Sequence, residues 1–245
     1  MRLTLRVLAM LGTLLACVPL HYLWTMARRP SPWPRRFLGA IGRIAGMRAR
    51  VAGKPLTRDV LFLANHLSWL DIMVLAGASG TAFVSKDEVG RWPVAGWLAR
   101  LNRTVFVARA ARGAVREQAD ALRAALASGQ PVALFPEGTT DGGPTLLPFR
   151  ASLLASLFPP LPGVRVQPVA LDYGYAANDI AWVGEEGALS NVRRILSRPG
   201  TVPVTIHFLE PVDPASAGDR KVLAERSRAE ILAALEPSAA GADRL

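Results

Sequence analysis

The stretch VLFLANHLSWLD, at residues 60–71, decides the fold of this chain. Its first five residues form an unbroken apolar run, which is typical of a strand buried on both faces of a parallel sheet. His66 and Asp71 follow where such a strand ends. In a regular helix a spacing of five residues turns two side chains away from each other, so the pair can meet only if His66 precedes a helix and Asp71 lies in its first turn. We therefore predict a strand, a turn and a helix that place an imidazole beside a carboxylate.

The residues between this pair predict where the helix begins. Ser68 is a good N-cap and Asp71 fits the acidic position of a capping box, so a helix is expected from here to about Gly77. This capping role is also the alternative, purely structural explanation of Asp71.

Strands and helices alternate along the rest of the chain. We expect strands at residues 81–85, 104–108, 131–135, 164–171 and 202–209, an amphipathic piece at 35–48, and helices within 87–101, 113–128 and 219–235. The alternation predicts an α/β fold, a single domain with a mixed, largely parallel central sheet flanked by helices. Open sheets of this kind bind ligands at the carboxyl ends of their strands, where His66 and the loop at 136–140 both follow a strand.

The N-terminal segment predicts a membrane helix. Residues 7–27 are apolar apart from Thr13, His21 and Thr25, which is about the length of a helix that spans a hydrocarbon core of ~30 Å. Pro19 and His21 leave open an interfacial or re-entrant segment, and a cleaved signal peptide is a further alternative. Arginines are more frequent after this segment than before it, which predicts that the following domain faces the cytoplasm.

We accordingly expect three regions. Residues 1–34 would form a membrane anchor and a proline-rich linker, residues 35–236 a catalytic domain, and residues 237–245 a solvated tail. The expected location is a bacterial-type inner membrane, with the catalytic domain on the cytoplasmic side.

Charge and composition limit the partners of the chain. A formal net charge of +10 favours anionic partners such as a phospholipid surface, nucleic acid or an acidic carrier protein. No stripe of basic residues interleaved with aromatic residues is present, so we expect no nucleic-acid partner. The one cysteine, Cys17, lies in the apolar N-terminal segment, which excludes an internal disulfide, a thiolate metal cage and a catalytic cysteine in the soluble part.

His66 and Asp71 have no obvious nucleophile of their own. The sequence contains no G-x-S-x-G elbow, Walker loop, H-E-x-x-H motif or dinucleotide-binding fingerprint, so hydrolase, nucleotide-binding and zinc-enzyme functions lose their usual support. A general base without a nucleophile suits the activation of a hydroxyl that the substrate brings. This pattern indicates group transfer.

Two motifs resemble those of the glycerolipid acyltransferases of the lysophosphatidic acid acyltransferase type. Asn65–Asp71 is similar to the family's N-H-x-x-x-x-D motif, and Phe135–Thr139 to its F-P-E-G-T motif, in the same order. Val105–Arg109 resembles the family's strand that ends in a phosphate-contacting arginine, and Gln167–Ala170 resembles its last, proline-containing motif. The similarity covers about residues 60–171. One departure is Thr140, which stands where many members have an arginine.

The resemblance implies an acyltransferase that uses neither a cofactor nor a metal ion. His66 would take the proton from a lysolipid hydroxyl as it attacks the thioester of an acyl carrier protein or coenzyme A donor, and Asp71 would orient His66. The residues implied for substrate binding are Arg109, Glu137, Gly138 and Thr139, with Lys86 as a candidate for stabilising the thioester oxyanion.

The first acceptor that the resemblance implies is lysophosphatidic acid, which would give phosphatidic acid. Thr140 weakens the case for a phosphate at that spot, because members resembling ornithine-lipid acyltransferases carry a neutral residue there. Another lysolipid, such as lyso-ornithine lipid, is therefore the alternative acceptor. A distant alternative is a non-enzymatic basic membrane protein that binds lipid, which explains the charge but not the pairing of His66 with Asp71.

Overall fold

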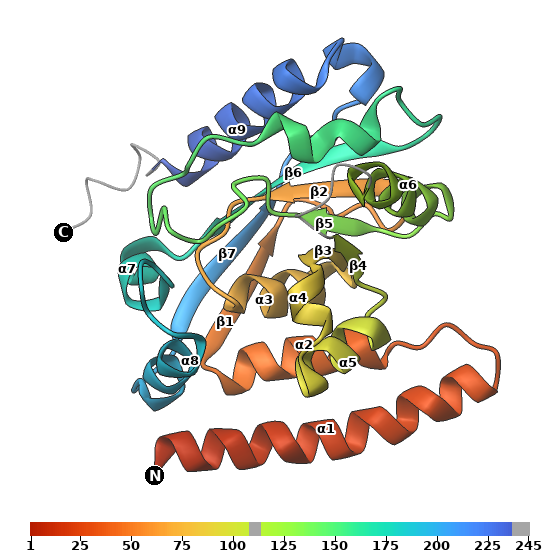
Figure 1. Ribbon diagram of the computed structural model, residues 1–245. Coiled ribbons are helices and arrows are strands. Elements are labelled where there is room, and N and C mark those ends of the chain that lie inside the picture. The colour runs from red at the N-terminus through yellow and green to blue at the C-terminus, as the bar shows by residue number, and fades with distance from the viewer. Residues whose placement is uncertain (108–113, 237–245) are drawn as a thin grey trace.

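The computed structural model of the chain describes residues 1–107 and 114–236. Within these residues the strands form one sheet in the order β1-β7-β6-β2-β5-β3-β4 (Figure 1). The strands are β1 (Met47–Ala52), β2 (Val60–Ala64), β3 (Ala82–Lys86), β4 (Val105–Val107), β5 (Val132–Leu134), β6 (Arg165–Asp172) and β7 (Val202–Phe208). β6 and β7 are antiparallel, whereas the other neighbouring strands are parallel. The predicted mixed, largely parallel sheet is confirmed.

Strand β2 is apolar throughout because both of its faces are covered. Val60, Phe62 and Ala64 belong to one hydrophobic core, and Leu61 and Leu63 to another. The first core is completed by α2 (Trp33–Ile44), α3 (Leu70–Ser79) and α8 (Ala188–Ser197), and the second by α6 (Ala114–Ala127), the 3-10 helix η1 (Ala151–Leu157) and α9 (Arg220–Leu235). All five side chains of β2 are fully buried, which fixes the strand whose end carries His66.

The remaining elements are short. α4 (Asp87–Gly90) and α5 (Pro93–Leu101) follow β3, while η2 (Gly174–Ala176) and α7 (Ala177–Ile180) follow β6. η3 (Pro214–Ala217) precedes α9. The loop after β6 therefore runs through η2 and α7 before it reaches α8.

The structure differs from the sequence-based prediction at four places, one of which is α8, a helix that was not predicted. Strand β1 was not predicted, because it lies at the edge of the sheet, pairs with β7 and exposes most of its side chains. Trp33 and Pro34 begin α2 instead of belonging to a linker, since proline fits the first turn of a helix, where its missing N–H needs no partner. Helix α3 begins at Leu70, so Ser68 is not its N-cap. The division into regions 1–34 and 35–236 stays a prediction, and the tail at 237–245 lies outside the described residues.

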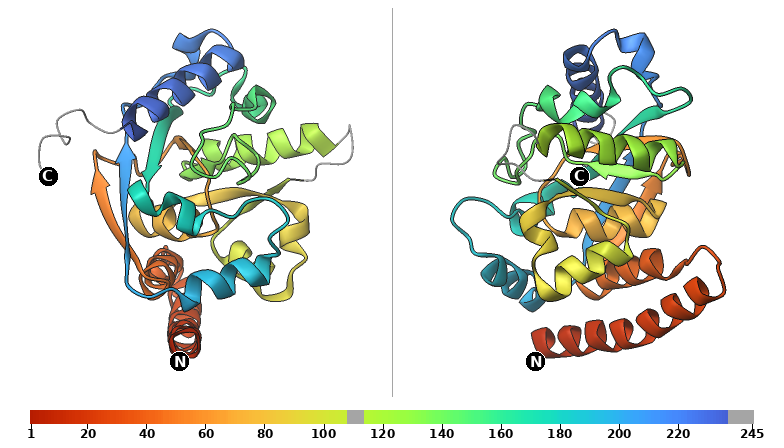
Figure 2. Two further views of the ribbon diagram at one scale, coloured as in Figure 1. Left: turned by 90° about the vertical axis from the view of Figure 1, so that its left-hand side faces the viewer. Right: turned by 45° about the vertical axis from the view of Figure 1, so that its right-hand side comes forward.

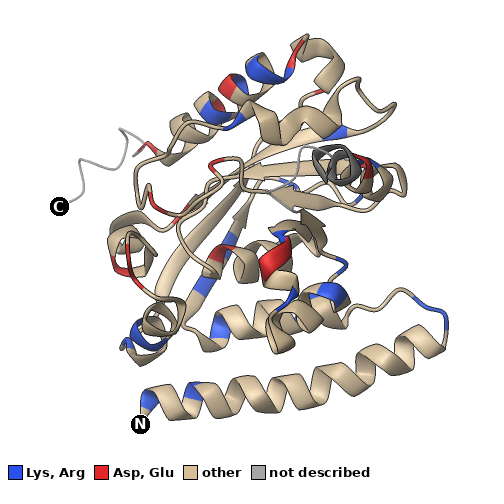
Figure 3. Cartoon of the chain, viewed as in Figure 1, with Lys and Arg blue, Asp and Glu red and all other residues tan. Residues whose placement is uncertain are grey.

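Helix α1 (Arg2–Met26) is long and apolar enough to cross a membrane, judged by length and composition, and its most apolar window is only 6% buried. It lies beside α2 at the end of the molecule opposite α9 (Figure 2). Lys and Arg are coloured at the two ends of α1 and in α2, but not in the middle of α1 (Figure 3). α1 is thus an apolar rod with basic ends on one side of the domain.

Both ends of α1 are tied to the domain. The Arg6 guanidinium donates hydrogen bonds to the carbonyl oxygens of Ile195, Leu196 and Arg198 at 3.0–3.3 Å. These carbonyls lie at the C-terminus of α8, the negative end of its dipole. At the other end, the Nδ1 atom of His21 lies 2.8 Å from the Ser31 hydroxyl.

Candidate active site

The turn between β2 and α3 folds His66 over Asp71. The Nδ1 atom of His66 lies 2.9 Å from Oδ2 of Asp71. The same Oδ2 accepts the backbone N–H groups of Leu67 (2.6 Å) and Ser68 (2.8 Å). Asp71 thus binds backbone N–H groups of the turn before α3 and holds the imidazole at once, so its structural and functional explanations do not compete.

The carboxylate of Asp71 is fully buried and has hydrogen bonds on both oxygens. Its Oδ1 accepts from the hydroxyl of Tyr173 at 2.6 Å, in addition to the three contacts of Oδ2. The side chain of Asp71 is 0% exposed and that of His66 is 18% exposed. A carboxylate at Nδ1 fixes the neutral ring with its proton on Nδ1 and its lone pair on Nε2. Among the described residues, Nε2 has no hydrogen-bond partner.

A second motif loop holds His66 from the other side. Oε1 of Glu137 accepts the backbone N–H of His66 at 2.8 Å, and Oε2 accepts that of Leu147 at 2.9 Å. The His66 ring stacks on Phe135, with centroids 3.9 Å apart and planes 10° apart. Burial raises the pKa of Glu137, although both backbone N–H groups act in the opposite direction. The strand ends of β2 and β5 therefore fix the backbone and the ring of His66 together.

The segment after β6 joins these two loops. The Trp182 N–H donates to the carbonyl of Leu67 at 2.8 Å, and the Trp182 carbonyl accepts from the Thr140 hydroxyl at 2.5 Å. Asn65 exchanges hydrogen bonds with the backbone of Leu171, at 2.7 and 3.1 Å. Tyr173 and Trp182 did not stand out in the sequence, because they lie more than 100 residues from Asp71 and outside the recognised motifs.

The structure also gives the positions of Thr139, Lys86 and Gly138, three further residues that were predicted to bind substrate. The Thr139 hydroxyl donates to Asp141 at 2.7 Å within its own turn, and Lys86 ends β3 with an exposed side chain. Gly138 has a φ of +72°, which glycine adopts readily, and a Cβ there would lie 3.4 Å from Nε of Arg150. Arg150 is a cation beside the F-P-E-G-T loop that the sequence reasoning missed. Arg109 lies outside the described residues.

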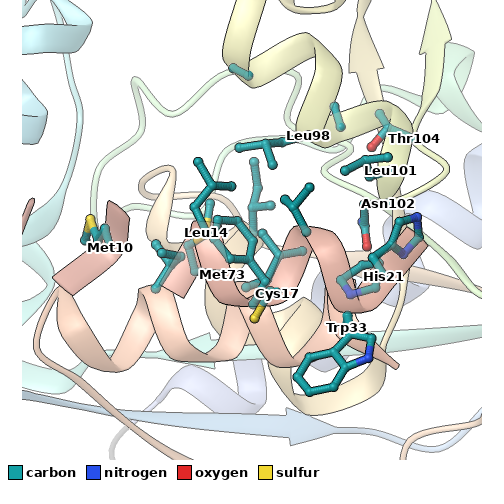
Figure 4. Close-up of a pocket in the computed structure, with 18 of the residues that line it drawn as sticks. Met10, Leu14, Cys17, His21, Trp33, Met73, Leu98, Leu101, Asn102 and Thr104 are labelled. Atoms are coloured by element: carbon teal, nitrogen blue, oxygen red, sulfur yellow. The ribbon is translucent and has the colours of Figure 1, made fainter. Parts of the chain in front are cut away.

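An apolar cavity of about 490 Å³ lies between α1 and α2 on one side and α3, β3, α4 and α5 on the other. The labelled side chains of α1, α3 and α5 point into it, among them Leu14, Met73 and Leu98 (Figure 4). Phe83 also lines it and stacks on Phe135, with centroids 5.9 Å apart. Because Phe135 in turn stacks on His66, two aromatic rings connect the cavity wall to the imidazole.

In the described part of the chain, no group of three or more His, Cys, Asp or Glu side chains could hold a metal ion.

Comparison with known proteins places this geometry in a family. The family described as "Acyltransferase" matches residues 48–172, about half of the chain, and the match contains the loops of His66 and Glu137. The chain belongs to the acyltransferase family. It is an acyltransferase of the lysolipid type, which sets aside the non-enzymatic alternative.

Similar proteins differ in the lipid that their names specify. The lyso-ornithine lipid O-acyltransferase of Brucella abortus (strain 2308) is 34% identical, over 98% of this chain and 96% of that protein. The 1-acyl-sn-glycerol-3-phosphate acyltransferase of Neisseria gonorrhoeae is 40% identical, but over 46% of this chain and 44% of that protein. The crystal structure of the 1-acyl-sn-glycerophosphate acyltransferase PlsC from Thermotoga maritima matches with a TM-score of 0.62 and 23% identity, covering 96% of this chain and 97% of that chain. This structural match concerns the fold alone.

Proposed function

We propose that this enzyme transfers a fatty acyl group from an acyl thioester to the free hydroxyl of lyso-ornithine lipid, with His66 as the general base. The observation that carries the proposal is the contact of His66 Nδ1 with a buried carboxylate, which leaves Nε2 available on a partly exposed side chain. A base in this state needs only a substrate hydroxyl and an acyl donor.

In the proposed reaction, His66 carries one proton from the acceptor hydroxyl to the leaving thiolate. Nε2 of His66 takes the proton of the acceptor hydroxyl as its oxygen attacks the thioester carbonyl. The carbon–sulfur bond then breaks, and the leaving thiolate recovers the proton from the imidazolium. Asp71 stabilises the imidazolium between these events, as in a serine-protease triad whose serine is replaced by the substrate.

The cavity beside the site suits the hydrocarbon part of a substrate. Its lining comes mainly from apolar side chains of α1, α2 and α5, and Phe83 brings it next to the rings that support His66. Burial of each CH₂ group is worth about 0.8 kcal/mol, so an acyl chain placed here gains affinity.

Two observations favour lyso-ornithine lipid as the acceptor. The similarity to the Brucella enzyme extends over nearly the whole of both chains, whereas that to the Neisseria enzyme covers less than half of each. In addition, Thr140 uses its hydroxyl on the Trp182 carbonyl, so this position offers no cation for a phosphate. Lysophosphatidic acid is the second candidate, and Arg150, a cation beside Gly138, is the observation that favours it.

We also propose attachment to a bacterial inner membrane through α1, with the catalytic domain on the cytoplasmic side. The apolar middle of α1, its basic ends and its low burial support this placement. The donor would be acyl carrier protein or a coenzyme A thioester, and the anionic membrane surface would attract the basic residues.

The test offers both acceptors and both donor classes to membranes that contain the full chain. Wild type is expected to acylate lyso-ornithine lipid faster than lysophosphatidic acid, and His66→Ala to lose about 10²–10⁴-fold in rate. His207→Ala is a matched control, because His207 lies in β7, which β6 separates from β2, and its loss is expected to leave activity unchanged. Equal activity of wild type and His66→Ala would refute the mechanism, and a preference for lysophosphatidic acid would overturn the acceptor.

A further inference from the structure

The phenol of Tyr173 lies behind Asp71, on the side away from His66. Tyr173 follows β6 and is fully enclosed in the same core as Phe62 and Leu70. Its hydroxyl donates to Oδ1 of Asp71 at 2.6 Å, while His66 approaches Oδ2. The tyrosine, the carboxylate and the imidazole therefore form one hydrogen-bonded row that begins in the core and ends at the partly exposed side chain of His66.

We infer that Tyr173 is a positioning residue of the acyl transfer, which holds Asp71 in place and shares its charge so that His66 stays available as a base. This inference rests on the proposed function, because it gives Tyr173 a task in that reaction. It adds to the pair His66 and Asp71 a third residue from a different strand end.

Among the described residues, hydrogen-bond donors and no lysine or arginine compensate the charge of Asp71. In the described part of the chain, the carboxylate accepts from Tyr173, from His66 and from the N–H groups of Leu67 and Ser68. A buried carboxylate without a cation favours protonation of the nearest base, which here is the imidazole. A strong neutral donor on Oδ1 shares the negative charge of Asp71 and so weakens its attraction for a second proton on the imidazole.

The environment of Tyr173 keeps its hydroxyl protonated, so that it can donate to Asp71. Burial, followed by the charge of Asp71, raises the pKa of Tyr173 well above its usual range, so the hydroxyl stays protonated. In the part of the chain that the structure describes, the other titratable groups near Asp71 are His66 and Glu137. Arg35 of α2 reaches the opposite end of α3, at the carbonyls of Gly77 and Ala78. The arginines of β1, which packs against α3, are exposed.

The test compares Tyr173→Phe with Tyr175→Phe in the full-length protein. Both changes remove one hydroxyl, but Tyr175 is 83% exposed and serves as the matched control. Tyr173→Phe keeps the buried ring and is expected to fold, which a thermal melt checks. We expect kcat to fall about 10-fold or more, KM for the lysolipid to stay within about twofold, and the acidic limb of the pH–rate profile to move upward by about 0.5–1 pH unit. Tyr175→Phe should match wild type in all three.

A second readout does not depend on activity. The chain has three histidines, so a histidine-labelled sample gives few imidazole resonances, and the signal missing in His66→Ala identifies that of His66. Its titration midpoint should rise in Tyr173→Phe and not in Tyr175→Phe. An unchanged or lowered midpoint would overturn the inference, as would a wild-type kcat and pH profile in Tyr173→Phe. If instead wild type and His66→Ala acylate equally, the proposed function fails whatever the titration shows.

Discussion

Replacing Asp71 by Asn or by Ala separates its contribution to folding from its contribution to catalysis. In Asp71→Ala, three buried donors lose their acceptor, namely the N–H groups of Leu67 and Ser68 and the hydroxyl of Tyr173. Each unsatisfied buried group costs about 1–3 kcal/mol, so the loss of about 3–9 kcal/mol approaches the whole stability of a typical domain, about 5–15 kcal/mol. We expect this variant to be poorly folded.

Asp71→Asn keeps most of these contacts. The amide oxygen can accept from Leu67, Ser68 and His66, and the amide nitrogen can donate to the oxygen of Tyr173 once its hydroxyl rotates. What disappears is the negative charge that faces the imidazolium, with Nδ1 and Oδ2 2.9 Å apart. Two unit charges about 4 Å apart interact by about 4 kcal/mol at an effective dielectric constant of about 20, which corresponds to about 10³-fold in rate.

The assay pairs chemical denaturation with acyl transfer by the same purified, detergent-solubilised samples. The free energy of unfolding of Asp71→Asn should lie within about 1–3 kcal/mol of the wild-type value, while its kcat falls about 10³-fold. In Asp71→Ala, by contrast, the free energy of unfolding should fall by about 3–9 kcal/mol. Activity of Asp71→Asn within tenfold of wild type would refute the electrostatic role. Equal stability of Asp71→Ala and wild type would refute the hydrogen-bond reasoning.

Three further changes test other parts of the structure. Burial raises the pKa of Glu137, so the protonated side chain stabilises the fold below the ordinary value of 4.5, and this stabilisation is lost as pH rises through the raised pKa. Chemical denaturation at several pH values should therefore show the stability of Glu137→Gln increasing relative to that of wild type as pH rises. A relative decrease would contradict this reasoning. Thr140→Arg should raise the activity toward lysophosphatidic acid relative to lyso-ornithine lipid, measured in mixed-acceptor assays, whereas Thr140→Ser keeps the hydroxyl for Trp182 and should behave as wild type. Arg6→Ala should cost about 1–2 kcal/mol and speed amide hydrogen exchange in residues 2–10, with Arg2→Ala as the control, and unchanged exchange would argue against the tie to α8.

The sequence predicted the sheet well where burial is complete. The runs at β2 and β5 are apolar without interruption because both faces of these strands are covered, and β6 is apolar along its buried part except at Gln167; such runs are visible in the sequence. β1 escaped prediction because an edge strand with exposed arginines carries no such pattern. α8 was also missed, although its buried Ile195 and Leu196 pack on the same core as β2.

Some residues of the candidate site could likewise be predicted from the sequence, and others could not. Sequence alone determined that His66 and Asp71 follow one strand and Glu137 another, since these residues lie in short, locally encoded motifs. Only the tertiary structure decided what surrounds them, because Tyr173 and Trp182 come from distant segments whose contacts depend on strand order, and Arg150 returns to Gly138 through the loop after β5. The stretch at residues 60–71 specifies a strand, a turn and a helix by itself. Its carboxylate becomes fully buried and fully hydrogen-bonded only when β6 pairs beside β2 and brings Tyr173 to Asp71.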